Sequence, residues 1–302
     1  MLIQNLALYE PGACIRVNRE NDPLFYFFDY DARAADENMQ FQHFHTFYEL
    51  CVLLSPSATH FLEGKPYELE TFDIVGIPPS VLHMTRYPEG DPSRRLIVQF
   101  SLPRGGDGLP GQVHQLLEVF RQEVPIFRFD PEIRARLYRR LNDIFLLTSS
   151  REPLRDLTLH LKFMDFLTLL YRHQGENRYA NTARRSPMEQ KLYDVASYIH
   201  AHYPEPLSLE SLSQRFYISS CYLSHRFREV TGFTVTDYIQ MTRVRNVQAV
   251  LLRGDTPITE AALGCGFTSF SQFNRVFRKH IGMTPSEYRR RYQVPGAETG
   301  PA

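Results

Sequence analysis

The chain carries one sequence unit twice near its C-terminal end. The unit reads LSLESLSQRFYISSCYLSHRFREVTGFTVTDY at 207–238 and TPITEAALGCGFTSFSQFNRVFRKHIGMTPSEY at 256–288. Matched pairs keep one constant offset: Leu223 and Phe273, Phe227 and Phe277, Arg228 and Arg278, Gly232 and Gly282, Thr234 and Thr284, and Tyr238 and Tyr288. A fixed offset of this kind is the signature of a repeated structural unit. This region must therefore fold as two small, similar units.

Each copy has the apolar spacing of two short amphipathic helices. In the first copy, apolar residues recur every three or four positions, at Leu209, Leu212 and Phe216 and then at Leu223, Phe227 and Val230. Ser208 is suited to cap the first helix. Gly232 and Gly282 are placed to end the second helices, because glycine adopts the left-handed conformation at little cost. Two short helices joined by a tight turn form a helix-turn-helix unit, whose second helix can lie in a DNA major groove.

The segment between the two copies, 234–254, is predicted to be one helix. Its apolar residues have helical spacing, at Tyr238, Met241, Val244, Val247 and Leu251. About twenty residues rising about 1.5 Å each give a rod of roughly 30 Å. One turn of DNA is about 34 Å long, so this rod is suited to hold two second helices in successive major grooves.

The region from 188 to 292 resembles the DNA-binding domain of the AraC/XylS family of bacterial transcription regulators. The second copy carries the family's signature residues: Ile258, Ala262, Gly266-Phe267, Phe273, Phe277, Gly282, Thr284-Pro285, Tyr288 and Arg289. The resemblance implies a transcription activator that binds double-stranded promoter DNA and works with RNA polymerase. It implies neither an enzyme nor a cofactor.

The exposed face of the second helix in each copy supplies the candidate DNA contacts. These are Ser220, Cys221, Ser224, His225, Arg226 and Arg228 in the first copy, and Ser269, Ser271, Asn274, Arg275, Arg278 and Lys279 in the second. Arginine pairs with guanine and asparagine with adenine, so Asn274 and Arg275 are the better base readers. Arg226, Arg228, Arg278 and Lys279 are expected to contact phosphates. His225 stands where the family usually has arginine. The alternative for any one of these residues is a solvated helix face.

Charge and composition agree with this interpretation. Residues 186–292 hold thirteen Lys and Arg against nine Asp and Glu, whereas residues 1–171 hold seventeen against twenty-three. The four cysteines, at 14, 51, 221 and 265, have no paired spacing, so they predict neither a disulfide framework nor a zinc motif. The start of the chain does not resemble a signal peptide, and the sequence contains no apolar run long enough to span a membrane. We therefore expect a cytoplasmic protein.

The first part of the chain, 1–110, has the pattern of a small antiparallel β-barrel or sandwich. Short runs rich in Val, Ile, Phe and Tyr alternate with turn residues. The predicted strands are 25–30, 47–54, 59–63, 65–69, 72–77 and 96–101. The whole chain is thus expected to be α+β, with a β-barrel flanked by helices ahead of an all-α DNA-binding domain.

The run from His43 to Glu49, together with the segment ending at His83, resembles the two half-motifs of the cupin barrel. In that pattern Pro56 and Phe72 occupy positions that are usually turn glycines. Cupin domains of this kind commonly sense a small molecule ahead of such a DNA-binding unit. The residues expected to bind the effector are His43, His45, Glu49, His83, Tyr48 and Phe28.

Three roles are open for the histidines and the glutamate. They are expected to line the polar end of an effector pocket, so no metal is assigned. The alternatives are a transition-metal site, since cupin residues of these types can converge on an ion, and a purely structural role. A metal would imply a cupin metalloenzyme or a metal-responsive regulator. The neighbouring aromatic residues would suit stacking on a sugar ring or, alternatively, filling the barrel, and the resemblance favours a carbohydrate effector.

The region 111–174 is predicted to be helical. Its apolar stripes, such as the one formed by Leu157, Leu161 and Met164, are broad enough to need a partner surface. In similar regulators such helices form the dimer, so a homodimer is expected. The polar segment 175–187 is predicted to be a flexible linker, and 293–302 a disordered tail.

Overall fold

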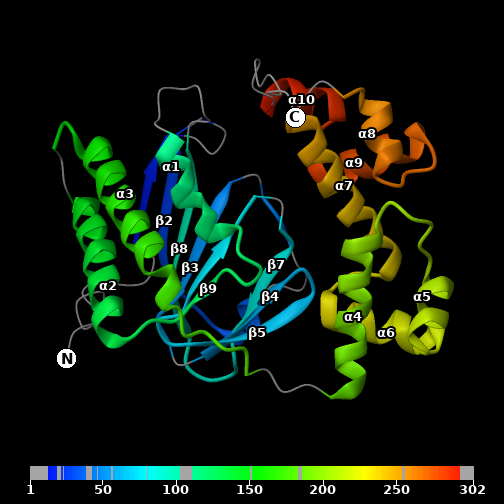
Figure 1. Ribbon diagram of the computed structural model, residues 1–302, viewed down its shortest axis with the longest axis horizontal. Coiled ribbons are helices and arrows are strands. Elements are labelled where there is room, and N and C mark those ends of the chain that lie inside the picture. Colours follow the sequence, from blue (N-terminus) through cyan, green and yellow to red (C-terminus); the bar gives the residue numbers. More distant parts are fainter. Residues whose placement is uncertain are drawn as a thin grey trace.

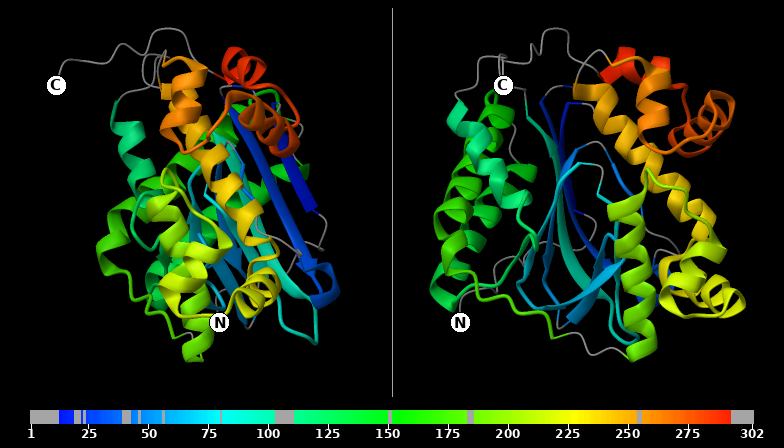
Figure 2. Two further views of the ribbon diagram at one scale, coloured as in Figure 1. Left: turned by 90° about the vertical axis from the view of Figure 1, so that its right-hand side faces the viewer. Right: turned by 45° about the vertical axis from the view of Figure 1, so that its right-hand side comes forward.

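The computed structural model describes residues 13–18, 22, 24–38, 43–45, 47–55, 57–79, 81–102, 111–149, 152–182, 186–253 and 256–292. These residues form four layers: helices, a six-stranded sheet, a three-stranded sheet and a second group of helices (Figures 1 and 2). The predicted mixture of antiparallel sheet and helix is confirmed. Pro56 and the tail 293–302 lie outside the described residues.

The larger sheet has the strand order β1-β2-β8-β3-β6-β9 and the smaller one β5-β4-β7, with every neighbouring pair antiparallel. The strands are β1 (Ala13–Val17), β2 (Phe25–Arg33), β3 (Tyr48–Leu53), β4 (Ser57–Leu62), β5 (Lys65–Glu70), β6 (Ile74–Ile77), β7 (His83–Arg86), β8 (Ser93–Ser101) and β9 (Ile126–Phe127). All six predicted strands are confirmed, whereas β1, β7 and β9 were not predicted. Among the described strands no ladder joins one sheet to the other, so the expected barrel is not closed.

A helical layer covers the outer face of the larger sheet. It contains α1 (Gly111–Gln115), a 3-10 turn at Leu116–Phe120, α2 (Pro131–Phe145), a 3-10 turn at Leu146–Ser149 and α3 (Arg155–His173). Alternate residues of β2, among them Tyr26 and Phe28, point into this layer and pack against Phe163 of α3. The large aromatic core on this side therefore joins the sheet to the helices.

Phe72 adopts a positive φ of 80° in the turn between β5 and β6. This is one of the two positions where the cupin pattern usually has glycine. A bulky residue there costs about 1–3 kcal/mol, which surrounding packing must offset. The Phe72 ring meets Tyr138 edge-on at 5.0 Å between centroids, and the Arg134 guanidinium lies 4.8 Å from its centroid. The bulky Phe72 side chain strains the turn, and the same side chain anchors the turn to α2.

The C-terminal helices match the predicted repeat. They are α4 (Pro187–His202), α5 (Leu209–Phe216), α6 (Ser220–Thr231), α7 (Val235–Arg253), α8 (Ile258–Gly264), α9 (Phe270–Ile281) and α10 (Pro285–Tyr292). The matched residues Leu223 and Phe273 are both fully buried. Gly232 and Gly282 end α6 and α9 with φ of 82° and 77°, in the left-handed region as expected. The long helix predicted between the copies is α7.

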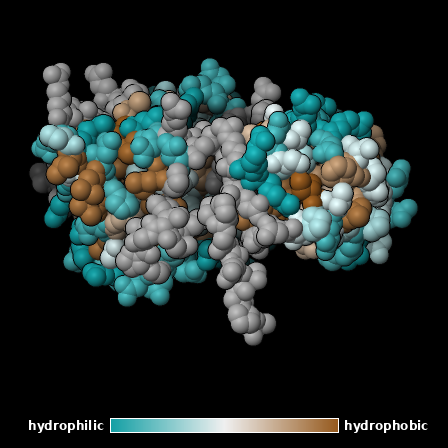
Figure 3. Space-filling view, turned by 90° about the horizontal axis from the view of Figure 1, so that it is seen from above, coloured by the Kyte–Doolittle hydropathy of each residue, from teal (hydrophilic) through white to brown (hydrophobic). Residues whose placement is uncertain are grey.

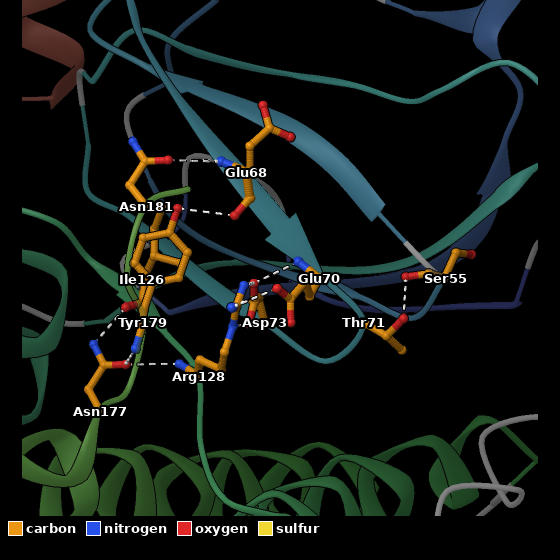
Figure 4. Close-up of polar contacts among 10 residues, drawn as sticks. All are labelled: Ser55, Glu68, Glu70, Thr71, Asp73, Ile126, Arg128, Asn177, Tyr179 and Asn181. Atoms are coloured by element: carbon orange, nitrogen blue, oxygen red, sulfur yellow. Dashed lines mark hydrogen bonds and ion pairs between the residues drawn. The ribbon is translucent and has the colours of Figure 1, made fainter. Parts of the chain in front are cut away.

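The first half of the predicted linker is fixed to the sheets (Figure 4). The Asn177 side chain donates to the carbonyl of Ile126 and accepts from the backbone of Arg128. Asn181 hydrogen-bonds to the backbone of β5, and the Tyr179 hydroxyl donates to the carbonyl of Glu68. Residues 183–185 lie outside the described part. The stretch up to Asn181 is therefore a strap across both sheets rather than a free chain.

Apolar side chains are exposed on the helical layer, at the left end of the view from above (Figure 3). Leu146, Leu154, Leu157 and Leu161 are each more than half exposed. Within the described residues, no helix has the length and apolar character needed to cross a membrane.

Candidate functional site

Helix α9 presents a row of basic and polar side chains to solvent. Asn274, Arg275, Arg278 and Lys279 line an open hollow together with Phe270. The two arginines and the lysine are exposed. Lys279 Nζ lies 3.0 Å from Asp237 Oδ1. An exposed ion pair of this kind is weak, so a DNA phosphate could take the place of the Asp237 carboxylate. The structure thus brings four of the six predicted contacts of the second copy onto one surface.

Two of the predicted DNA contacts have structural roles in the described chain. The Ser269 hydroxyl accepts from the backbone N–H of Gln272 and so caps α9. The Ser220 hydroxyl lies 2.9 Å from that of Ser213 and ties α6 to α5. Ser271 stays exposed at the start of α9.

Phe270 is a surface residue that the sequence analysis missed. Its ring is 42% exposed beside the basic row of α9. The sequence does contain a signal for this residue. Phe270 is an apolar residue at the first position of the helix, where the first copy has Ser220. Apolar side chains at such positions can contact the methyl group of thymine.

Helix α6 differs from α9 because an acidic residue lies among its predicted contacts. Glu229 pairs with Arg226, and one of its oxygens lies 3.4 Å from His225 Nδ1. Cys221, Ser224 and Arg228 are exposed. The positive charge of this face is therefore partly neutralised within the helix itself.

The tip of the β4–β5 hairpin docks the smaller sheet onto α4 and α7. Glu63 and Gly64 both have positive φ, as in a type I′ turn. Glu63 pairs with Arg245 of α7 and lies 3.9 Å from His200 Nδ1. A Cβ on Gly64 would stand 2.5 Å from the Cβ of Ala196 in α4, so only glycine fits this approach.

Strand β7 makes a second contact, with α6. The Arg86 guanidinium donates to the carbonyls of Glu229 and Val230 at the end of α6, at 3.2 and 3.3 Å. A cation there satisfies carbonyls that the helix leaves free. Sequence reasoning missed this docking surface, because a contact between residues so far apart leaves no local pattern.

Burial shifts the pKa of two groups in the docking surface. Burial lowers the pKa of His200 to about 4, and its Nε2 lies 2.9 Å from the Tyr238 hydroxyl. For Glu63, burial acts to raise the pKa, but Arg245 and His200 outweigh it, and the pKa falls below its usual value. The docked state therefore favours a neutral histidine beside an ionised glutamate.

Three of the predicted sensor residues converge between the two sheets. His43 and His83 form an isolated antiparallel bridge with two backbone hydrogen bonds of 2.9 Å, and their ring centroids are 4.2 Å apart. The His45 ring centroid is 4.9 Å from that of His83. Glu49 is buried beside them and accepts a 3.0 Å hydrogen bond from Gln99.

The charge states within this cluster follow from its burial. Burial lowers the pKa of His83 well below its usual value and also lowers that of His43. Burial alone would raise the pKa of Glu49, but hydrogen bonding and the neighbouring His45 and His83 outweigh it, so its carboxylate stays ionised. The cluster is a buried anion surrounded by imidazoles.

The other two predicted effector residues lie on the opposite face of the larger sheet. Phe28 is fully buried against Phe145 and Phe163, and Tyr48 packs on Phe100 and Phe120. Successive residues of a strand point to opposite faces, so Tyr48 faces the helices where Glu49 faces the smaller sheet. The prediction that Tyr48 and Phe28 share a pocket with Glu49 is therefore corrected.

Comparison with known proteins finds one family model and several transcription regulators that resemble this chain. A family model described as "Helix-turn-helix domain" matches residues 212–291. The uncharacterized HTH-type transcriptional regulator YijO of Escherichia coli is 39% identical over 112 residues, which are 37% of this chain and 38% of YijO. Regulatory protein SoxS of Escherichia coli is 34% identical over 100 residues, 33% of this chain and 94% of SoxS. The HTH-type transcriptional activator RhaS of Escherichia fergusonii is 24% identical over 250 residues, 82% of this chain and 87% of RhaS.

Proposed function

Because the chain belongs to the AraC/XylS family of transcription regulators, we propose that it is a sequence-specific DNA-binding activator controlled by a small molecule. The observation that carries this proposal is the row on α9 formed by the exposed Arg275, Arg278 and Lys279 and the half-buried Asn274. It combines two side chains suited to base edges with two suited to phosphates. No catalytic role is assigned to any residue.

In this proposal α5–α6 and α8–α9 are two helix-turn-helix units held by α7. The nineteen residues of α7 span about 28 Å at the usual helical rise of about 1.5 Å per residue. That length supports binding to successive major grooves on one side of the duplex. Asn274 and Arg275 would read bases, with Ser271 beside them. In α6 the corresponding contacts would come from Cys221, Ser224 and His225, and Arg226 and Arg228 would contact phosphates.

The region 1–110 is proposed to be the cupin-like sensor, and the cluster of His43, His45, Glu49 and His83 its recognition site. Buried polar groups that face one another between two sheets support this assignment. The predicted carbohydrate effector has less support, because Phe28 and Tyr48, two of the aromatic residues that suggested stacking, instead pack in the core beneath the helices.

The region 111–174 is proposed to form a homodimer. Leu154, Leu157 and Leu161 follow one another along the start of α3 and are each more than half exposed. A second copy of the chain would remove this apolar surface from water. The residues 175–187 would then connect the dimer to DNA-binding units at 188–292, and RNA polymerase is the expected partner at the promoter.

The proposal is tested by selecting double-stranded DNA from a random library with the full chain and sequencing the bound fraction. We expect an enriched motif with two half-sites about 10–10.5 base pairs apart for each chain. The Asn274→Ala/Arg275→Ala double variant serves as the control and should lose the enrichment in the half-site read by α9. A folded protein that binds DNA without enriching any sequence would contradict the proposal.

A further inference from the structure

Phe270 presents an apolar ring to solvent at the start of α9. The ring is 42% exposed, and its centroid lies 5.9 Å from that of Phe273, which is fully buried. One side of the ring is therefore held against the core of the second helix pair, while the rest faces water. Covering such a ring with another apolar group is favourable, because both surfaces leave water.

The ring lies in the same hollow as the two predicted base readers. Phe270, Asn274 and Arg275 all line it. Phe270 and Asn274 are four residues apart, which makes them neighbours on one face of the helix. Within the described part of the chain, the side chains of Asn274 and Arg275 form no hydrogen bond or ion pair. A partner that fills this hollow therefore meets free polar groups and an apolar ring together.

The DNA major groove offers one apolar group to such a ring. Base edges present nitrogen and oxygen donors and acceptors there, and thymine also presents its 5-methyl group. A phenyl ring placed against a donor or acceptor would remove that atom from water without a hydrogen bond in return, which costs free energy. A ring placed against the methyl group instead removes apolar surface from water, which is favourable.

We propose that Phe270 is a specificity-determining residue, whose ring contacts the 5-methyl group of one thymine in the half-site read by α9. The inference rests on the proposed function and names one base of the DNA site. One helical turn of about 5.4 Å separates Phe270 from Asn274, and neighbouring base pairs are about 3.4 Å apart. The thymine is therefore expected within about two base pairs of the adenine that Asn274 binds.

The first copy lacks this contact. Ser220 occupies the matched position at the start of α6, and its hydroxyl lies 2.9 Å from that of Ser213. A small polar side chain that is bonded within the protein offers no apolar surface to a methyl group. The matched position of the half-site read by α6 should therefore be insensitive to a thymine methyl group, and it provides an internal control in the same DNA.

The contact is tested by removing the methyl group alone. The DNA motif selected by the full chain is synthesised with each thymine replaced in turn by deoxyuridine, which keeps the base pairing and every hydrogen-bonding atom. We expect the affinity of the wild-type chain to fall about fourfold at one thymine of the α9 half-site, which is the effect of burying one methyl group. The matched position of the α6 half-site should show a smaller change.

Variants assign the effect to the ring. Phe270→Ala should bind thymine and deoxyuridine DNA equally at that position, and the coupling between the two changes follows from the double cycle. Phe270→Leu keeps an apolar side chain and should retain part of the methyl dependence. Leu263→Ala is the matched control, because Leu263 is an exposed apolar residue of α8 that lies outside the hollow. It should respond as the wild type does. Circular dichroism shows whether each variant folds, and Phe270→Leu decides the matter if Phe270→Ala unfolds.

5-Methylcytosine gives a second measurement, because it carries a methyl group at the same ring position as thymine. At the sensitive position, replacing the T·A pair by a C·G pair should weaken binding. Methylation of that cytosine should restore part of the affinity for the wild type but not for Phe270→Ala. No gain from the methyl group in the wild type would count against the contact.

Two results would overturn the inference. One is equal affinity of the wild-type chain for thymine and deoxyuridine DNA throughout the α9 half-site, and the other is the same methyl dependence in wild type and Phe270→Ala. Either result leaves the DNA-binding function in place. Absence of any enriched motif would instead contradict the proposed function, and the inference with it.

Discussion

The two helix pairs share one core and differ on their surfaces. Phe227 and Phe277 are both fully buried at matched positions, and Gly232 and Gly282 end both second helices. On the exposed face, however, Glu229 of α6 corresponds to Lys279 of α9, and His225 corresponds to Arg275. The repeat therefore keeps the packing residues, while its two exposed faces are suited to different tasks.

The contacts of each pair agree with this division. Helix α6 receives Arg86 from β7 of the smaller sheet at its C-terminal end. The elements that pack closely on α9 are α7, α8 and α10, all within the DNA-binding region. We infer that the first pair couples the DNA-binding region to the smaller sheet and that the second pair supplies most of the base reading.

The largest expected effect is on the docking of α4 against the β4–β5 hairpin at low pH. His200 has a folded pKa of about 4 against an ordinary value of 6.5, and it faces Glu63, Arg245, Lys65 and the Tyr238 hydroxyl. A lowered histidine pKa contributes stability that is complete above pH 6.5 and is lost as the pH falls toward 4. The shift corresponds to about 3 kcal/mol of unfolding free energy.

Urea unfolding of the full chain at a series of pH values measures this loss. The variant His200→Gln should unfold with a smaller pH dependence between 6.5 and 4, and the difference from wild type isolates His200 from the other buried histidines. Identical pH dependence in the two proteins would show that the docked histidine does not titrate as described.

The next effect comes from the hairpin tip. Gly64→Ala places a methyl group against Ala196 in a backbone conformation that alanine avoids, so either the hairpin tip moves away from α4 or the turn becomes strained. We expect a loss of about 1–3 kcal/mol in the free energy of unfolding. Gly90→Ala is the control, since Gly90 also has positive φ but nothing within 4 Å of its Cβ position. If both variants lost the same free energy of unfolding, the loss would come from backbone strain alone, and the contact with Ala196 would contribute nothing.

The smallest effect contrasts the two charges at matched positions. Glu229→Gln frees Arg226 for phosphate, so the slope of log affinity against log salt should steepen by about 0.9. Lys279→Gln removes a phosphate contact and should flatten the slope by about 0.9. Both slopes come from DNA titrations at several salt concentrations. If both substitutions steepened the salt slope, or both flattened it, positions 229 and 279 would not face the duplex in the same way.

Local patterns in the sequence predicted the helices well. Caps and helical spacing act within a few residues, so the limits of α6, α7 and α9 follow from the chain itself. The strap at 177–181 escaped prediction, because its hydrogen bonds reach strands far away in the sequence. Asn177 and Tyr179 lie in a polar segment, and nothing in the segment itself indicates the strands that they contact.

Strand faces were harder to predict than strand positions. Both faces of the larger sheet are buried, one against helices and one against the smaller sheet, so hydrophobic alternation does not show which face is which. Tyr48 and Phe28 were consequently placed in the wrong layer. The two-residue strand β9 follows a helical segment and is too short for a periodic signal.

The division of labour between the two helix pairs is tested most directly by one matched comparison. Arg275→Ala and His225→Ala change the same position in the two copies, and each variant is titrated with the DNA motif selected by the wild-type full chain and with single-base variants of it. The account predicts that Arg275→Ala costs about 1–3 kcal/mol and relaxes discrimination at one base pair, whereas His225→Ala costs less than about 0.5 kcal/mol. Equal losses for the two variants, or the larger loss for His225→Ala, would contradict it.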